Sequence, residues 1–171
     1  AESVRTLRTS LSLLNLDKEQ QAIMITSSVP KEGKTTVSIN LAFALGQLDK
    51  TILIDADLRR PSVGKQFGIP NYQPGVANLI LKSHTFDECL VQDEESKIDI
   101  LSAGTIPSNP QELLADKGFG ELIAQLKTQY KYVVVDTAPT QAVSDSMVIA
   151  NSVFFSLIGD SELEKLSKLI L

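Results

Sequence analysis

The chain is organised around one segment near its start: Ile25-Thr26-Ser27-Ser28-Val29-Pro30-Lys31-Glu32-Gly33-Lys34-Thr35-Thr36. The apolar run at 22–25 just before it predicts a short buried strand. Apolar residues come after it at the spacing of one helix face: Val37, Leu41, Leu45 and Leu48. That spacing predicts a helix over 35–48. The segment is therefore a short loop that joins a buried strand to a helix.

The composition of this loop favours binding of a phosphate group. The free backbone N–H groups and the positive dipole end at the start of a helix attract anions. Lys34 would reach the β- and γ-phosphates of a nucleotide, and the Thr35 hydroxyl would ligate Mg²⁺. Ser28 stands where such loops usually have their first glycine, and Pro30 stiffens the backbone. The alternative is a strand-to-helix turn in which Gly33 only permits a tight bend.

Two further apolar runs end in aspartate, at 51–55 and 132–136. Ligands of doubly wound sheets bind at the carboxyl ends of the strands, so these aspartates are candidates for a shared site. Asp136 would hold Mg²⁺ through water, across from the loop. Of Asp55 and Asp57, one would hold a metal-bound water and the other would take a proton, and the sequence does not rank them. The alternative is a capped loop with solvated acids.

These patterns, together with a family resemblance carried by the same motifs, give three sets of candidate site residues. The catalytic candidates are Lys34, Asp55, Asp57 and Asp136. The metal-ligand candidates are Thr35, Asp55 and Asp136. The nucleotide-binding candidates are Ser28, Pro30, Lys31, Glu32, Gly33, Lys34, Thr35, Thr36 and Arg59.

Strand and helix patterns alternate along the whole chain. Strands are predicted at 22–25, 51–55, 98–101, 132–136 and 153–158. Helices are predicted at 1–16, 35–48, 75–81, 85–91 and 111–115, with another ending near 129 and a last one at 161–171. This alternation predicts an α/β fold with a doubly wound, mostly parallel sheet flanked by helices. A length of 171 residues fits a single domain over 1–171.

The charge and hydropathy of the chain exclude some classes of partner. A net charge of −5 argues against a nonspecific grip on nucleic acid or anionic lipid, because both need a positive face. No apolar run approaches the roughly 18 residues of a membrane span. The chain begins at Ala1 and not at methionine. We therefore expect a fragment, with any membrane helices of its parent outside it.

The first predicted helix has a charged face. Its apolar stripe consists of Val4, Leu7, Leu11 and Leu14. Glu2, Arg5 and Arg8 share a second face at a spacing of three residues. One interpretation is pairing within the helix, which contributes little to stability. The other is a contact for a neighbouring subunit.

Taken in order, four motifs resemble the cytoplasmic kinase domain of bacterial protein-tyrosine kinases that govern capsule and exopolysaccharide synthesis. They lie in the region from about residue 1 to about 160. They are Glu2-x-x-Arg5-x-x-Arg8, similar to a subunit-contact motif; 28–36, similar to Walker A; Asp55-x-Asp57-x-Arg59, similar to Walker A′; and 133–139, similar to Walker B. The resemblance also implies the P-loop NTPase superfamily.

The resemblance implies an ATP- and Mg²⁺-dependent protein-tyrosine autokinase that controls polysaccharide polymerisation and export. It implies a ring of like subunits that meet through Glu2, Arg5 and Arg8. It also implies a cytoplasmic domain that associates with the membrane through a fused transmembrane segment or a separate adaptor. The polysaccharide itself is not specified by the residues, and no nucleic-acid partner is expected.

Departures from the family pattern keep two alternatives open. Lys31 replaces a glycine, and Ala138 stands near the position of a proline. The three tyrosines form no cluster, so we expect the final strand and the tyrosine-rich tail of the family to be missing. The alternatives are a partitioning or cell-division ATPase, which has a second lysine where Val29 stands, and a non-catalytic, nucleotide-dependent assembly scaffold.

Overall fold

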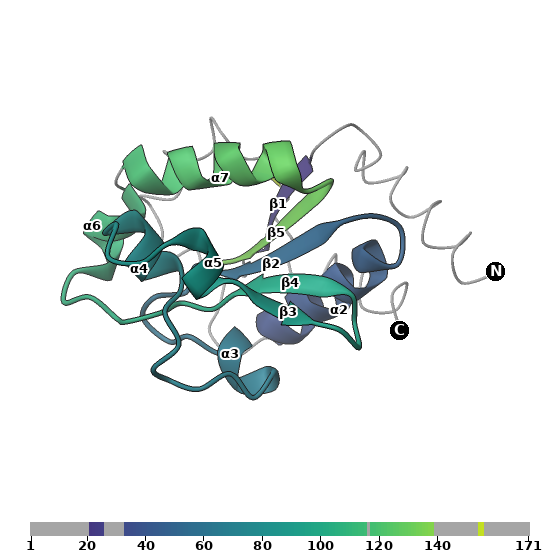
Figure 1. Cartoon of the computed structure of the whole chain (residues 1–171), viewed down its shortest axis with the longest axis horizontal. Coiled ribbons are helices and arrows are strands. Elements are labelled where there is room, and N and C mark those ends of the chain that lie inside the picture. The colour runs from purple at the N-terminus through teal and green to yellow at the C-terminus, as the bar shows by residue number, and fades with distance from the viewer. Residues whose placement is uncertain (1–20, 26–32, 116, 139–153, 156–171) are drawn as a thin grey trace.

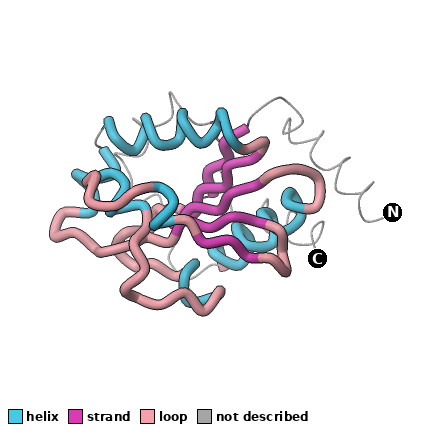
Figure 2. The backbone as a smooth tube through the Cα atoms, in the orientation of Figure 1, coloured by secondary structure: helices cyan, strands magenta, loops and turns pink. Residues whose placement is uncertain are grey.

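The computed structural model describes residues 21–25, 33–115, 117–138 and 154–155. Over these residues, six strands form one sheet in the order β3-β4-β2-β5-β1-β6 (Figures 1 and 2). The strands are β1 (Gln21–Ile25), β2 (Thr51–Asp55), β3 (Val91–Asp93), β4 (Ile98–Leu101), β5 (Tyr132–Asp136) and β6 (Phe154–Phe155). The helices are α2 (Lys34–Gly46), α3 (Val63–Gln66), α4 (Val76–Ile80), α5 (Phe86–Cys89), α6 (Pro110–Ala115) and α7 (Lys117–Gln129).

The central strands are parallel, as the sequence predicted. β5 lies between β1 and β2 and pairs with both in parallel. Every residue of β2 and of β5 is buried. Strands covered on both faces read as continuous apolar runs, which is why these two were recognisable in the sequence. The predicted α/β class with a mostly parallel sheet is confirmed.

Helices cover both faces of the sheet, so the sheet is doubly wound. In Figure 1, α7 runs along one face and α2 lies on the other. Leu41 and Leu45 of α2 pack with Leu53 and Val134 in one core cluster. A second cluster is built around the stripe of α7, which consists of Phe119, Ile123 and Leu126. Each such side chain stabilises the fold by about 1.5–3 kcal/mol.

The sheet edge beyond β4 differs from the prediction. A helix was predicted over 85–91, but α5 ends at Cys89 and Val91 begins β3, which is antiparallel to β4. A three-residue strand with half-exposed positions carries too little alternation to be recognised in the sequence. The helices predicted at 1–16 and 161–171 lie outside the described residues. Within the part of the chain that is described, no helix combines the length and the hydrophobicity that crossing a membrane requires.

Candidate active site

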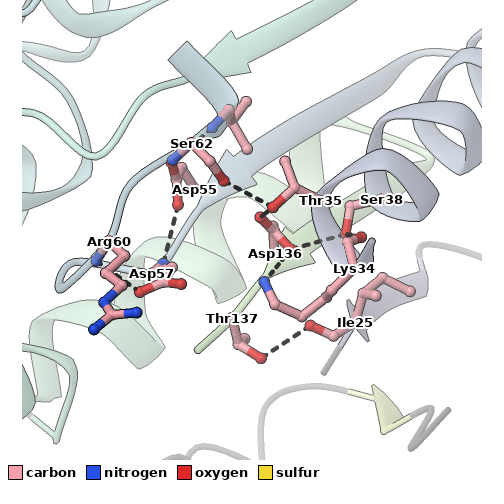
Figure 3. Close-up of polar contacts among 11 residues, drawn as sticks. Ile25, Lys34, Thr35, Ser38, Asp55, Asp57, Arg60, Ser62, Asp136 and Thr137 are labelled. Carbon is pink, nitrogen blue, oxygen red and sulfur yellow. Dashed lines mark hydrogen bonds and ion pairs between the residues drawn. The ribbon is translucent and has the colours of Figure 1, made fainter. Parts of the chain in front are cut away.

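The site is built where α2 begins, next to the carboxyl end of β5. Gly33 precedes the helix with φ of 72°, in the left-handed region that glycine adopts without strain. This bend places Lys34 and Thr35 in the first turn of α2. The Lys34 Nζ lies 2.6 Å from the Asp136 Oδ1. Lys34 is 8% exposed and Asp136 is fully buried, so the two charges form a buried ion pair (Figure 3).

Hydroxyl groups complete the surroundings of the Asp136 carboxylate. Thr35 Oγ1 donates to its Oδ2 at 2.9 Å, and Ser38 Oγ donates to its Oδ1 at 3.0 Å. Ser62 Oγ lies 2.7 Å from Thr35 Oγ1 and extends the network toward β2. Sequence reasoning missed Ser38 and Ser62. The spacing of four residues between Lys34 and Ser38, one turn of the same helix face, was a signal for the first of them.

Asp55 lies beside Asp136 because β2 and β5 are neighbours in parallel register, with these two residues paired. Its side chain is fully buried and accepts three backbone hydrogen bonds. The N–H of Asp57 donates to its Oδ1 at 3.0 Å, and those of Ser62 and Val63 donate to its Oδ2 at 3.1 Å. Burial, and next the charge of Asp136, raise the pKa of Asp55 from 3.8 to about 7 despite these bonds.

Two other predicted residues follow β2 in the same loop. Asp57 is buried, and its Oδ1 accepts a hydrogen bond from the N–H of Arg60 at 3.1 Å. This contact closes a turn, so Asp57 stabilises the loop that follows β2. Arg59 is exposed.

The structure thus brings Lys34, Thr35, Asp55 and Asp136 together, with Asp57 two residues further along. Gly33 precedes α2 and Thr36 lies in its first turn, and both are exposed. The remaining nucleotide-binding candidates, Ser28, Pro30, Lys31 and Glu32, lie outside the described residues.

A cavity of about 310 Å³ opens beside Asp55. Its walls come from three places: the loop after β2 with α3, the segment 69–73, and the loop that follows β4. Residues from these places that line it include Lys65, Asn71, Gln73 and Ser102. Asp55 therefore lies at the wall of a space that another molecule can enter.

The side chains that meet here suit a magnesium nucleotide. Asp136 pairs with the buried Lys34, and the buried Asp55 lies beside Asp136 in register, so the cluster holds more carboxylates than cations and a bound cation would offset the excess negative charge. Carboxylates and a threonine hydroxyl are hard oxygen donors of the kind Mg²⁺ prefers. The raised pKa of Asp55 indicates unfavourable crowding of negative charge, which a bound cation relieves.

Fold and site together define a P-loop nucleotide-binding domain. A family profile described as "AAA domain" matches residues 21–169. Tyrosine-protein kinase YwqD of Bacillus subtilis is 36% identical over 173 residues, which cover 98% of this chain and 73% of that protein. The chain belongs to the family of bacterial tyrosine-protein kinases.

Solved structures agree with this assignment. The VpsO kinase domain superposes with a TM-score of 0.81 at 40% identity, over 98% of this chain and 87% of that one. The kinase domain of the Escherichia coli tyrosine kinase ETK superposes with a TM-score of 0.83 at 32% identity, over 99% of this chain and 69% of that one. The family and the enzyme class expected from the sequence are therefore confirmed.

The cell-division ATPase MinD of Pyrococcus furiosus represents the rival class. It superposes with a TM-score of 0.65 at 23% identity, over 80% of this chain and 58% of that one. Likeness at this identity shows the shared fold alone.

Proposed function

We propose that this chain transfers the γ-phosphoryl group of ATP to tyrosine hydroxyls in an Mg²⁺-dependent reaction. The observation that supports the proposal most is the meeting of Lys34, Thr35 and two buried aspartates at the carboxyl ends of neighbouring strands. Phosphoryl transfer depends mainly on positioning and on neutralising charge, and these groups are fixed by burial and hydrogen bonds.

Each residue has a distinct part in this proposal. The Lys34 ammonium offsets negative charge on the β- and γ-phosphates. Because this ammonium also pairs with Asp136, the phosphates and Asp136 compete for it. Thr35 and Asp136 would hold Mg²⁺. When bound, Mg²⁺ neutralises charge on the phosphate oxygens. The backbone N–H groups at the start of α2 would add to this attraction for phosphate.

The sequence left open which aspartate accepts the phenolic proton, and we assign this part to Asp55. Asp55 lines the cavity, whereas Asp57 holds Arg60 in a turn. Asp57 would then help to orient the loop that carries Asp55.

We further propose that the domain serves capsule or exopolysaccharide synthesis at the cytoplasmic face of the membrane. The family resemblance supports this setting. The chain spans 73% of YwqD but 22% of the Escherichia coli relative Etk, so such domains occur in short and in long proteins. A membrane segment could therefore be fused to the domain or supplied by an adaptor. Subunits would meet through Glu2, Arg5 and Arg8, which lie outside the described residues.

The proposal is tested by replacing Lys34. Lys34→Met should lose roughly a hundredfold or more of the rate at which the wild type phosphorylates a tyrosine peptide with Mg²⁺-ATP, because one fixed charge is removed. Nucleotide affinity, measured by calorimetry, should fall as well. The variant also leaves the buried Asp136 without its cation, which costs about 3 kcal/mol of stability.

Two controls separate chemistry from folding. Lys34→Arg keeps a cation next to Asp136 and should stay close to wild type in thermal unfolding, while still transferring phosphate slowly. Lys50→Met changes an exposed lysine at the opposite end of β2 and should leave transfer intact. If a folded Lys34→Arg or Lys34→Met protein keeps full activity, the assigned site is wrong. A wild type that binds nucleotide but never labels the peptide would be a scaffold.

A further inference from the structure

The loop that follows β4 forms one wall of the cavity beside Asp55. It supplies four of the lining residues: Ser102, Ala103, Gly104 and Ile106. Among the described residues, those that would hold the phosphates and Mg²⁺, namely Lys34, Thr35 and Asp136, do not line this cavity. The shape of the cavity therefore bears on the molecule that receives the phosphoryl group more than on the nucleotide.

The backbone of this loop runs in direct contact with the start of α4. The Val76 N–H donates to the Ser102 carbonyl at 2.8 Å, and the next N–H of the helix donates to the next carbonyl of the loop at 3.0 Å. These bonds satisfy N–H groups that the first turn of a helix leaves without an internal partner. A Cβ on Gly75 or on Gly104 would overlap backbone atoms of the opposite segment, so both glycines are needed for this approach.

The side chain of Asn78, in α4, joins the two segments. Its Oδ1 accepts hydrogen bonds from the N–H of Gly75 and from the N–H of Thr105, each at 3.0 Å. Its Nδ2 donates to Thr105 Oγ1 and to Ser83 Oγ, each at 3.3 Å. The residue is only 6% exposed. Because buried N–H groups are costly to leave unpaired, this amide fixes the loop after β4 against α4.

Apolar packing connects the same contact with a second wall of the cavity. Ala77 of α4 and Ala103 of the loop belong to one core cluster with Leu58 and Leu113. Leu58 lies in the loop that follows β2, which also supplies Pro61 to the cavity lining. The position of both walls relative to Asp55 is therefore set through α4.

We propose that Asn78 is a positioning residue for the phosphoryl acceptor. By holding residues 102–106 against α4, it keeps the cavity in the shape that a tyrosine-bearing segment enters. The inference rests on the proposed function, since it concerns acceptor binding at the same site. Asn78 does not itself line the cavity, and in the described part of the chain it makes no hydrogen bond to Lys34, Asp55 or Asp136. It therefore acts on acceptor binding through the loop and leaves the transfer step unchanged.

The experiment is steady-state phosphorylation of a tyrosine peptide with Mg²⁺-ATP by wild type and Asn78→Leu. Leucine has a similar volume but bonds neither Gly75 nor Thr105. The KM for the peptide should rise roughly tenfold, while kcat and the KM for ATP stay within about twofold of wild type. A residue that served folding alone would lower the melting temperature without this split.

A conservative variant should restore peptide binding. Asn78→Asp keeps an oxygen for the N–H groups of Gly75 and Thr105, and the Thr105 hydroxyl can rotate to donate to the second oxygen. Its KM for the peptide should lie much closer to wild type than that of Asn78→Leu. If Asn78→Leu does not fold, Thr105→Val provides the test, because it removes one bond of Asn78 to the loop at an exposed position. Its KM for the peptide should rise by a smaller factor.

Two controls separate positioning from stability. Ser83→Ala removes the one partner of the Asn78 side chain that lies outside the two joined segments, and it should leave the KM for the peptide unchanged. Leu45→Ala opens a cavity in the core cluster of α2, in the last turn of that helix. It should lower the melting temperature without changing the KM for the peptide.

The outcomes distinguish this inference from the proposed function. An active wild type whose KM for the peptide is unaltered in folded Asn78→Leu, or in Thr105→Val where Asn78→Leu does not fold, would overturn the role of Asn78 alone. An equal rise in the KM for ATP, or an equal rise for the peptide in Leu45→Ala, would overturn it as well. A wild type that never phosphorylates the peptide would overturn the proposed function and the inference with it.

Discussion

Replacing Asp55 with asparagine should make the stability of this domain much less dependent on pH. Burial and the charge of Asp136 raise the pKa of Asp55 from 3.8 to about 7 in the folded chain. Between these two values the folded state holds a proton that the unfolded state has released. Stability therefore falls as the pH rises through this window, by about 1.4 kcal/mol per pH unit. The full difference corresponds to about 4 kcal/mol, complete below pH 3.8 and lost above pH 7.

Asparagine removes the charge but cannot reproduce all the hydrogen bonds. Asp55 accepts from Asp57 with one oxygen and from Ser62 and Val63 with the other. The amide has a single oxygen, so at least one backbone N–H loses its partner, at a cost of about 1–3 kcal/mol that does not vary with pH. The variant should be less stable than wild type at pH 5, and the difference should shrink or reverse at pH 8.

Urea unfolding at pH 5, 6, 7 and 8 measures this directly. The stability of wild type relative to Asp55→Asn should fall by about 3 kcal/mol over the series. Asp87→Asn, which removes an exposed carboxylate on α5, is the control and should follow wild type throughout. If the curves for wild type and Asp55→Asn run parallel, the pKa of Asp55 does not lie within the tested range in the folded chain, and the predicted effect of burial and of the Asp136 charge is wrong.

Two further predictions concern packing and assembly. Gly75→Ala should lower stability by about 3 kcal/mol, because its Cβ would lie 2.0 Å from the Ser102 carbonyl oxygen; Gly64→Ala, where the nearest atoms are at 3.6 Å, should be nearly neutral in the same urea assay. Arg5→Ala combined with Arg8→Ala should give folded monomers with normal ATP binding and weakened transfer between copies. Light scattering with Mg²⁺-ADP checks this, and persistence of the wild-type assembly in the double variant would show that the charged face is only solvated.

Much of the fold could be predicted from local pattern alone. β2 and β5 are short apolar runs because both of their faces are covered, and α2 was recognisable from helical spacing. β3 could not be found in this way, since three half-exposed residues at a sheet edge have no distinctive pattern. The positions where local signals are weak are those where pairing with a neighbouring strand supplies the order.

The candidate site shows the same division. Lys34, Thr35, Asp55 and Asp136 were named from loop chemistry and from acids that follow apolar runs. The hydroxyl groups of Ser38 and Ser62 were not, because serine is common in helices and loops and its partners here lie 98 and 27 residues away in the chain. Only their approach in space makes them part of the site.

The sequence by itself pointed to the residues that we propose carry the chemistry, because a phosphate-binding loop and strand-end carboxylates are local patterns. The tertiary structure decided what those residues experience. The order of strands places β5 beside β2, so Asp55 and Asp136 meet in register, and burial in that position raises the pKa of Asp55. The same packing buries Tyr130 while leaving Tyr72 in solvent. The burial of a residue and its electrostatic coupling depend on neighbours that are distant in the sequence, and only the fold decides which residues those neighbours are.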